Sequence, residues 1–213
     1  MATLAELRAL VSSIIQDSSF NDTSLNSYLN RGVSEIAGGV SSTYGSFITP
    51  PLPNLFTIST VTTSTSLAYV SMPATFQRAL RFVSNSDGQE IDIYNSMIEF
   101  SSDYPLMDGS GDVISVIEQG GNLYYQKIPT VAKTLTLHFF RLPVAMSLDA
   151  STPDGIPSHL AESLLVNFAC KEIFSITGNS ESNISQYVAL FNAAVRTLEN
   201  TIPNDTRSLI LGD

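Results

Sequence analysis

The chain has 213 residues, of which 43% are hydrophobic and only 14% are charged, and its formal net charge is −10. The hydrophobic share is enough for a folded core and excludes wholesale disorder, and the length suits one domain or two small ones. The Lys and Arg residues are scattered and no two are adjacent, which excludes a basic surface that wraps nucleic acid tightly and disfavours anionic membranes.

The first predicted elements are two helices joined as a hairpin. Thr3 and Glu6 have the spacing of a capping box, and apolar residues recur at helical spacing after them. Asn21 is a good cap for a second helix, which we expect to stop at Gly38-Gly39 because glycine tolerates the left-handed C-cap conformation. A segment rich in Gly, Pro and Ser follows, so residues 1–54 are predicted to be a helical hairpin and a linker.

After residue 54 the spacing of apolar residues changes from helical to alternating. About seven short strands are predicted, in the segments 56–61, 67–70, 79–83, 90–94, 113–117, 122–126 and 134–140. A helical turn over Ser96–Tyr104 is expected between two of them. Residues 55–142 are therefore predicted to form a small antiparallel sandwich or barrel.

Residues 143–203 predict a second linker and a second helical hairpin. Ser158 is expected to cap a helix of about 159–176, and a last helix of about 182–201 follows. An amphipathic hairpin cannot bury its apolar face alone, so the two terminal hairpins should unite in one four-helix bundle. The predicted fold class is α+β, with terminal helices in a bundle and an inserted antiparallel β module.

An extended tail, residues 204–213, contains the apolar run Leu209-Ile210-Leu211. Three consecutive apolar residues after the last helix suggest a segment that docks. One interpretation is strand addition or groove insertion on another subunit. The alternative, packing back on the chain's own bundle, has equal support.

The sequence holds few residues suited to catalysis or metal binding. Cys170 is the one cysteine and lies in an apolar helical run, where a buried structural thiol is expected. His138 and His159 are not spaced as metal ligands. The run Asp108–Asp112 lacks the ligand pattern of a calcium loop and is interpreted as a hairpin turn. We therefore expect a protein that is not an enzyme and that binds no cofactor or metal.

The sequence also gives no sign of a membrane partner. No apolar stretch approaches the ~20 residues that a membrane span requires. The N-terminus has neither the basic region nor the cleavage site of a secretory signal. We therefore expect assembly inside a cell.

Several stretches together suggest a family. They are Leu4–Asp17, Leu29–Ala37, Tyr69–Phe76, Gly120–Tyr125, Leu135–Pro143, Asp154–Pro157 and Asn167–Ile173. These stretches resemble head-to-tail adaptor proteins of tailed bacteriophages. The likeness spans nearly the whole chain, and its motifs are structural rather than catalytic.

The resemblance implies a ring, usually a dodecamer, attached beneath the portal protein and continuing the DNA channel. The C-terminal tail, with Arg207, Leu209, Ile210 and Leu211, would dock on the portal. The β module would contact neighbouring copies or carry the tail or nozzle protein below the ring. DNA would pass through without sequence-specific binding. The implied location is the neck of the virion, after assembly in the host cytoplasm.

Two other functions remain open on the sequence. One is a different ring of the same particle, such as another neck or tail-completion protein. The other is a carbohydrate- or receptor-binding β module on a helical stalk, which the absence of Trp disfavours. A glycan array would separate this last function from the structural ones.

Overall fold

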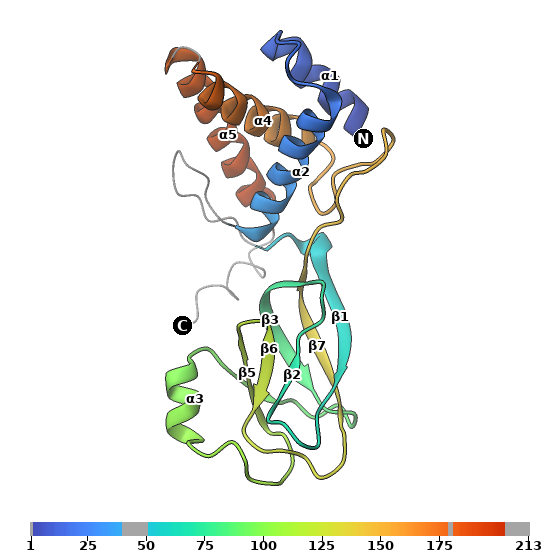
Figure 1. The fold of residues 1–213 in the computed structure, drawn as a ribbon, viewed down its shortest axis with the longest axis vertical. Helices are drawn as coiled ribbons and strands as arrows, with labels where there is room; N and C mark the ends of the chain where they lie inside the picture. Colours follow the sequence, from blue (N-terminus) through green and yellow to red (C-terminus); the bar gives the residue numbers. More distant parts are fainter. Residues whose placement is uncertain (1, 40–50, 179–180, 203–213) are drawn as a thin grey trace. The chain divides into compact units, whose positions relative to one another are not determined.

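The computed structural model describes residues 2–39, 51–178 and 181–202, with helices at both ends of the chain and strands between them (Figure 1). The chain divides into two compact units. Unit 1 comprises Met1–Leu55 and Leu142–Asp213 and is helical, whereas unit 2 comprises Phe56–Arg141 and is built mainly of strands. The predicted α+β class, with terminal helices flanking a β module, is confirmed.

Unit 1 begins with the predicted hairpin, formed by α1 (Leu4–Ile15) and α2 (Asp22–Gly38). The capping box of α1 is present, because the Thr3 backbone N–H donates to Glu6 Oε2 over 2.8 Å and the Glu6 N–H donates to Thr3 Oγ1 over 3.3 Å. The Asn21 side chain caps α2 by accepting from the Ser24 N–H.

The second hairpin consists of α4 (Ala161–Thr177) and α5 (Glu181–Thr201). The predicted cap of α4 was wrong. The N-cap position is Leu160, which forms no side-chain cap, rather than Ser158. The cause is a turn in which the Leu160 N–H donates to the Pro157 carbonyl over 2.9 Å, and this turn delays the start of the helix.

Helix α4 is the centre of the bundle, because it contacts α1, α2 and α5. Because Gly32 has no side chain, α2 can lie close against α4 at this point. A Cβ atom at Gly32 would lie 2.8 Å from Cδ1 of Phe168, closer than packed atoms allow. The Phe168 ring in turn packs edge-on against Phe191 of α5, with 5.6 Å between ring centroids. The terminal segments of the chain thus share one core.

Unit 2 contains two sheets. Sheet A has the strand order β1-β7-β3, and sheet B has the order β2-β6-β5-β4. The strands are β1 (Phe56–Thr62), β2 (Tyr69–Ser71), β3 (Phe76–Ser84), β4 (Asp92–Tyr94), β5 (Ser115–Gln119), β6 (Asn122–Tyr125) and β7 (Thr134–Arg141). Their inward side chains form one core, which includes Met72, Val83, Ile91, Val113, Val116, Leu123, Tyr125, Leu135, Leu137 and Phe139.

One strand pair departs from the predicted antiparallel module. Strands β4 and β5 run parallel, with Asp92 paired to Ser115 and Tyr94 to Ile117. Parallel neighbours need a crossover connection. Helix α3 (Met97–Asp103), the predicted helical turn, lies in that crossover and packs on both strands. Sheet B is therefore mixed, and the alternating apolar pattern could not reveal strand direction.

Candidate assembly surfaces

Cys170 and His138 both lie in packed surroundings. Cys170 is fully buried in α4, and burial raises the pKa of its thiol to about 12, so the thiolate is not formed at neutral pH. His138 lies in β7 between the rings of Phe56 and Phe82, with centroid distances of 5.8 and 5.1 Å. Across residues 2–39, 51–178 and 181–202, His, Cys, Asp and Glu form no group of three that could hold a metal ion.

The interpretation of Asp108–Asp112 as a hairpin turn was wrong. This run precedes β5 and is hydrogen-bonded to the segment that connects β6 with β7. The Ile128 N–H donates to the Gly109 carbonyl over 2.8 Å, and the Gly111 N–H donates to the Ile128 carbonyl over 3.1 Å. The two hydrogen bonds make an isolated parallel bridge.

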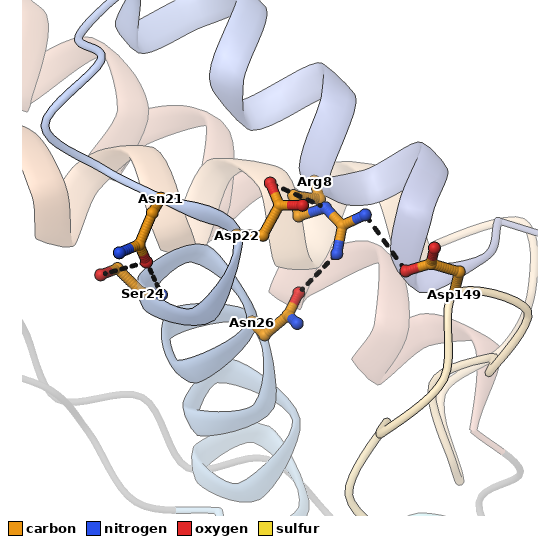
Figure 2. Close-up of polar contacts among 6 residues, drawn as sticks. All are labelled: Arg8, Asn21, Asp22, Ser24, Asn26 and Asp149. Atoms are coloured by element: carbon orange, nitrogen blue, oxygen red, sulfur yellow. Dashed lines mark hydrogen bonds and ion pairs between the residues drawn. The ribbon is translucent and has the colours of Figure 1, made fainter.

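Arg8 of α1 holds together three segments of unit 1 (Figure 2). Its guanidinium lies 3.4 Å from Asp22 Oδ1 and 3.1 Å from Asp149 Oδ1, and it donates to Asn26 Oδ1 over 3.4 Å. The Arg8 side chain is 17% exposed, whereas both carboxylates are mostly exposed. Helices α1 and α2 and the linker before α4 thus share one cation.

The same linker is fixed by backbone contacts. The Asn30 amide of α2 donates to the Met146 carbonyl over 3.0 Å and accepts from the Met146 N–H over 2.7 Å. The Leu4 N–H, one of the free donors at the start of α1, donates to the Ser151 carbonyl over 2.8 Å. The linker is therefore attached to both α1 and α2.

A chain of charges runs from the interior of the bundle, at Lys171, to the half-exposed Arg31 at its surface. Lys171 Nζ lies 2.9 Å from Glu172 Oε1 and 4.4 Å from the centroid of the Phe168 ring. Glu172 Oε2 lies 3.2 Å from Arg31 Nη1 on α2, and Arg31 Nε lies 2.7 Å from Glu35 Oε1. Lys171 is only 2% exposed. Opposite charges alternate along this network, which offsets the cost of burying them.

The outer face of sheet A is apolar and partly exposed, since Phe56 is 43% exposed there whereas Phe140 is 5% exposed. Residues paired across β1 and β7 point to the same face, so Phe56 and Phe140 are neighbours there, as are Ile58 and His138. Ile58 is 59% exposed. The guanidinium of Arg81 on β3 lies 6.0 Å from the Phe140 ring centroid and therefore covers this face too. We call Phe56, Ile58, Arg81, Phe82, His138 and Phe140 the Arg face.

The predicted docking residues Arg207, Leu209, Ile210 and Leu211 lie outside the described residues. Sequence reasoning missed the Arg8 contacts, the buried Lys171 and the Arg face. For the Arg face a signal existed, because Phe56 and Ile58 alternate with the smaller Thr57 and Ser59 along β1, although alternation does not tell which side is buried. For Arg8 the partners are distant in sequence, and for Lys171 the adjacent Glu172 is joined to Arg31, which lies far away in sequence on α2.

The helices of the described segments include none long and apolar enough to cross a membrane.

A family model described as SU10 adaptor protein matches residues 2–209. A comparison with curated proteins gave no match. The match spans both units, and with the α+β fold it defines the class of the molecule as a bacteriophage adaptor protein. Within that class the chain belongs to the SU10 adaptor protein family, and the resemblance seen in the sequence is confirmed.

Proposed function

We propose that copies of this protein form a ring between the phage portal and the tail and that the ring extends the DNA channel. The observation that carries the proposal is the family match over residues 2–209, which takes in the helical unit and the β unit alike. The proposed location is the neck of the virion, after assembly in the host cytoplasm. The proposed role is structural, without catalysis.

The organisation of unit 1 supports a ring subunit. A subunit packed between two neighbours must keep its shape under load, and the Arg8 contacts and the Asn30–Met146 pair fix the linker to the first hairpin. The net charge of −10 supports a channel through which DNA passes, because an acidic wall repels phosphate and prevents adhesion. No sequence-specific contact with DNA is proposed.

We place attachment to the portal in residues 204–213, with Arg207, Leu209, Ile210 and Leu211 as the docking residues. Fixing the backbone of this segment costs about 10 kcal/mol at ~1 kcal/mol per residue. Burying its three large aliphatic side chains contributes at most about 9 kcal/mol. A single tail is therefore marginal, and stable attachment requires many tails acting together around a closed ring.

Deleting residues 204–213 tests this role. We expect the shortened protein to keep its fold, measured by circular dichroism, and to lose co-sedimentation with purified portal. A triple variant, Leu209→Ser, Ile210→Ser and Leu211→Ser, should lose attachment equally. Asn204→Ser, in the same tail but at a residue not proposed to dock, is the matched control that should still attach. Retained attachment of the deletion variant would contradict the proposed tail.

The mass of the assembly tests the ring itself. Light scattering of the protein alone and with portal should show a closed oligomer on the portal, and a dodecamer is the expected size. A complex that carries a single copy per portal assembly would contradict a ring. The tail or nozzle protein below the ring is the expected third component.

A further inference from the structure

The arginines and the carboxylates of unit 2 lie on different parts of it, while Lys127 lies beside Gly111 among the acidic residues. Strands β1, β3 and β7 of sheet A contain arginines but no Asp or Glu. Every Asp and Glu of the unit lies between Asp87 and Glu118, on sheet B, on α3 or in the connections around them. One unit therefore carries a basic sheet and an acidic side.

The basic sheet presents the Arg face, on which apolar groups and cations adjoin. Ile58 and Phe56 are exposed, and the Arg81 guanidinium lies over the Phe140 ring. Burial, together with the neighbouring charge of Arg81, lowers the pKa of Arg78 to about 10. The cations thus sit close together beside aromatic rings, a composition typical of the cores of protein interfaces.

The acidic side centres on α3, and it also exposes apolar residues. Ile98 is 83% exposed on α3, and Leu106 just beyond the helix is 76% exposed. Glu99 and Asp103 lie on the same helix. We call Ile98, Glu99, Asp103 and Leu106 the α3 side. Helix α3 is held against its strands by Phe100, whose ring packs edge-on against Tyr94 at 5.3 Å.

The geometry points to a head-to-tail contact in which the Arg face of one copy docks on the α3 side of the next copy. This inference rests on the proposed ring and names the surfaces that close it. Each surface offers an exposed apolar centre, and their charges are opposite. Helix α3 and strand β1 lie at opposite sides of unit 2 (Figure 1). Two different, complementary surfaces set apart on one subunit generate rings when the rotation between copies closes.

The occupant is a second copy rather than another acidic partner, because unit 2 itself carries the complement of the Arg face. Exposed apolar side chains that no element of the same unit covers are costly in a monomer. Burying Ile58 in the contact contributes enough that Ile58→Asp should weaken association of the copies about tenfold or more. Arg81→Glu should weaken association as well, and less so in high salt, because the Coulomb attraction is then screened.

The decisive experiment mixes two full-length variants and measures mass by sedimentation velocity. Ile58→Asp damages the Arg face, and Ile98→Asp damages the α3 side. Alone, each variant should fail to form rings, because every contact contains a damaged surface. Mixed, they retain one intact contact, so the expected product is a one-to-one heterodimer that grows no further. Val131→Asp, at a residue 66% exposed in the same unit, is the matched control and should assemble as the wild type does.

Three outcomes would overturn the contact. Dimers of Ile98→Asp alone would show that the Arg face pairs with itself. Rings of Ile58→Asp as abundant as those of wild type would show that the contact lies elsewhere, and would leave the ring function standing. A wild-type protein that neither binds portal nor self-associates would overturn the proposed function and this contact together. Near-native circular dichroism and thermal melting of each variant exclude misfolding as the cause.

Discussion

The two units of this adaptor differ in where their charged residues lie. In unit 1, Arg8, Arg31 and Lys171 each contact carboxylates of the same unit, and Lys171 does so in the interior. In unit 2, Arg81 lies on one sheet and the carboxylates lie on the other side. The difference teaches that paired charges serve the fold of unit 1, whereas in unit 2 the separation of arginines from carboxylates is the basis of the proposed contact between copies.

The largest expected effect breaks the internal pairing of unit 1. Glu172→Ala leaves Lys171 buried without its closest carboxylate, at 2.9 Å in the native protein. Removing one member of a buried pair typically costs about 3 to 5 kcal/mol. We expect a loss of that size in the free energy of unfolding, measured with urea.

The matched control is the double variant Lys171→Met with Glu172→Gln, which removes both buried charges. Its loss should be much smaller, since no uncompensated charge remains. Equal losses in the single and double variants would show that packing, rather than charge pairing, is responsible.

A smaller effect is expected in unit 2 from the loss of a buried hydrogen bond between uncharged groups, that of the Tyr125 hydroxyl. The hydroxyl of fully buried Tyr125 donates to the Leu67 carbonyl over 2.7 Å and accepts from the Ser64 N–H over 2.8 Å. Tyr125→Phe leaves both backbone groups without this partner, which costs about 1 to 3 kcal/mol. Urea unfolding checks the loss. Tyr124→Phe on the same strand is the control and should change stability by about 0.5 kcal/mol or less.

Arg8→Met should cost about 1 kcal/mol, because the carboxylates that it loses are mostly exposed. Thermal melting at low and high salt checks this, since screening weakens exposed pairs. The difference between wild type and variant should shrink in high salt. A difference that is independent of salt would assign the loss to packing of the Arg8 stem instead.

The smallest effect concerns the start of α1. The Thr3 backbone N–H and then its hydroxyl hold the pKa of Glu6 below its usual 4.5. A lowered pKa in the folded state contributes stability above pH 4.5, and this contribution is lost as the pH falls through the folded value. Wild type should therefore exceed Glu6→Gln slightly in melting temperature at neutral pH, and the two should converge on acidification. A constant difference would contradict the assigned cause.

The elements that sequence predicts well are those with local causes. The capping box of Thr3 and Glu6 and the cap at Asn21 act within one helical turn, so both were visible in the sequence and both are present. The burial of Cys170 was also predicted from its apolar neighbours and is confirmed. Ser158 failed as a cap because a turn at Pro157 intervened.

What the sequence hides is set by contacts between distant segments. Lys171 looks like a surface residue of α4, but its ammonium lies 5.0 Å from the ring centroid of Phe191 on α5, and its partner Glu172 is reached by Arg31 from α2. The strand order β1-β7-β3 likewise brings Phe56, Phe82 and His138 together from three separate stretches. The parallel pairing of β4 with β5 depends on the path of α3, which alternation cannot encode.

The burial of Cys170 has a practical consequence for labelling experiments. Because the chain's single native thiol is fully buried and stays protonated at neutral pH, maleimide dyes and spin labels should leave the folded protein untouched. If a cysteine replaced an exposed residue such as Val131, it would then be the one labelled residue in each copy. The native Cys170 therefore need not be replaced before distances between labels on different copies are measured by fluorescence or electron spin resonance.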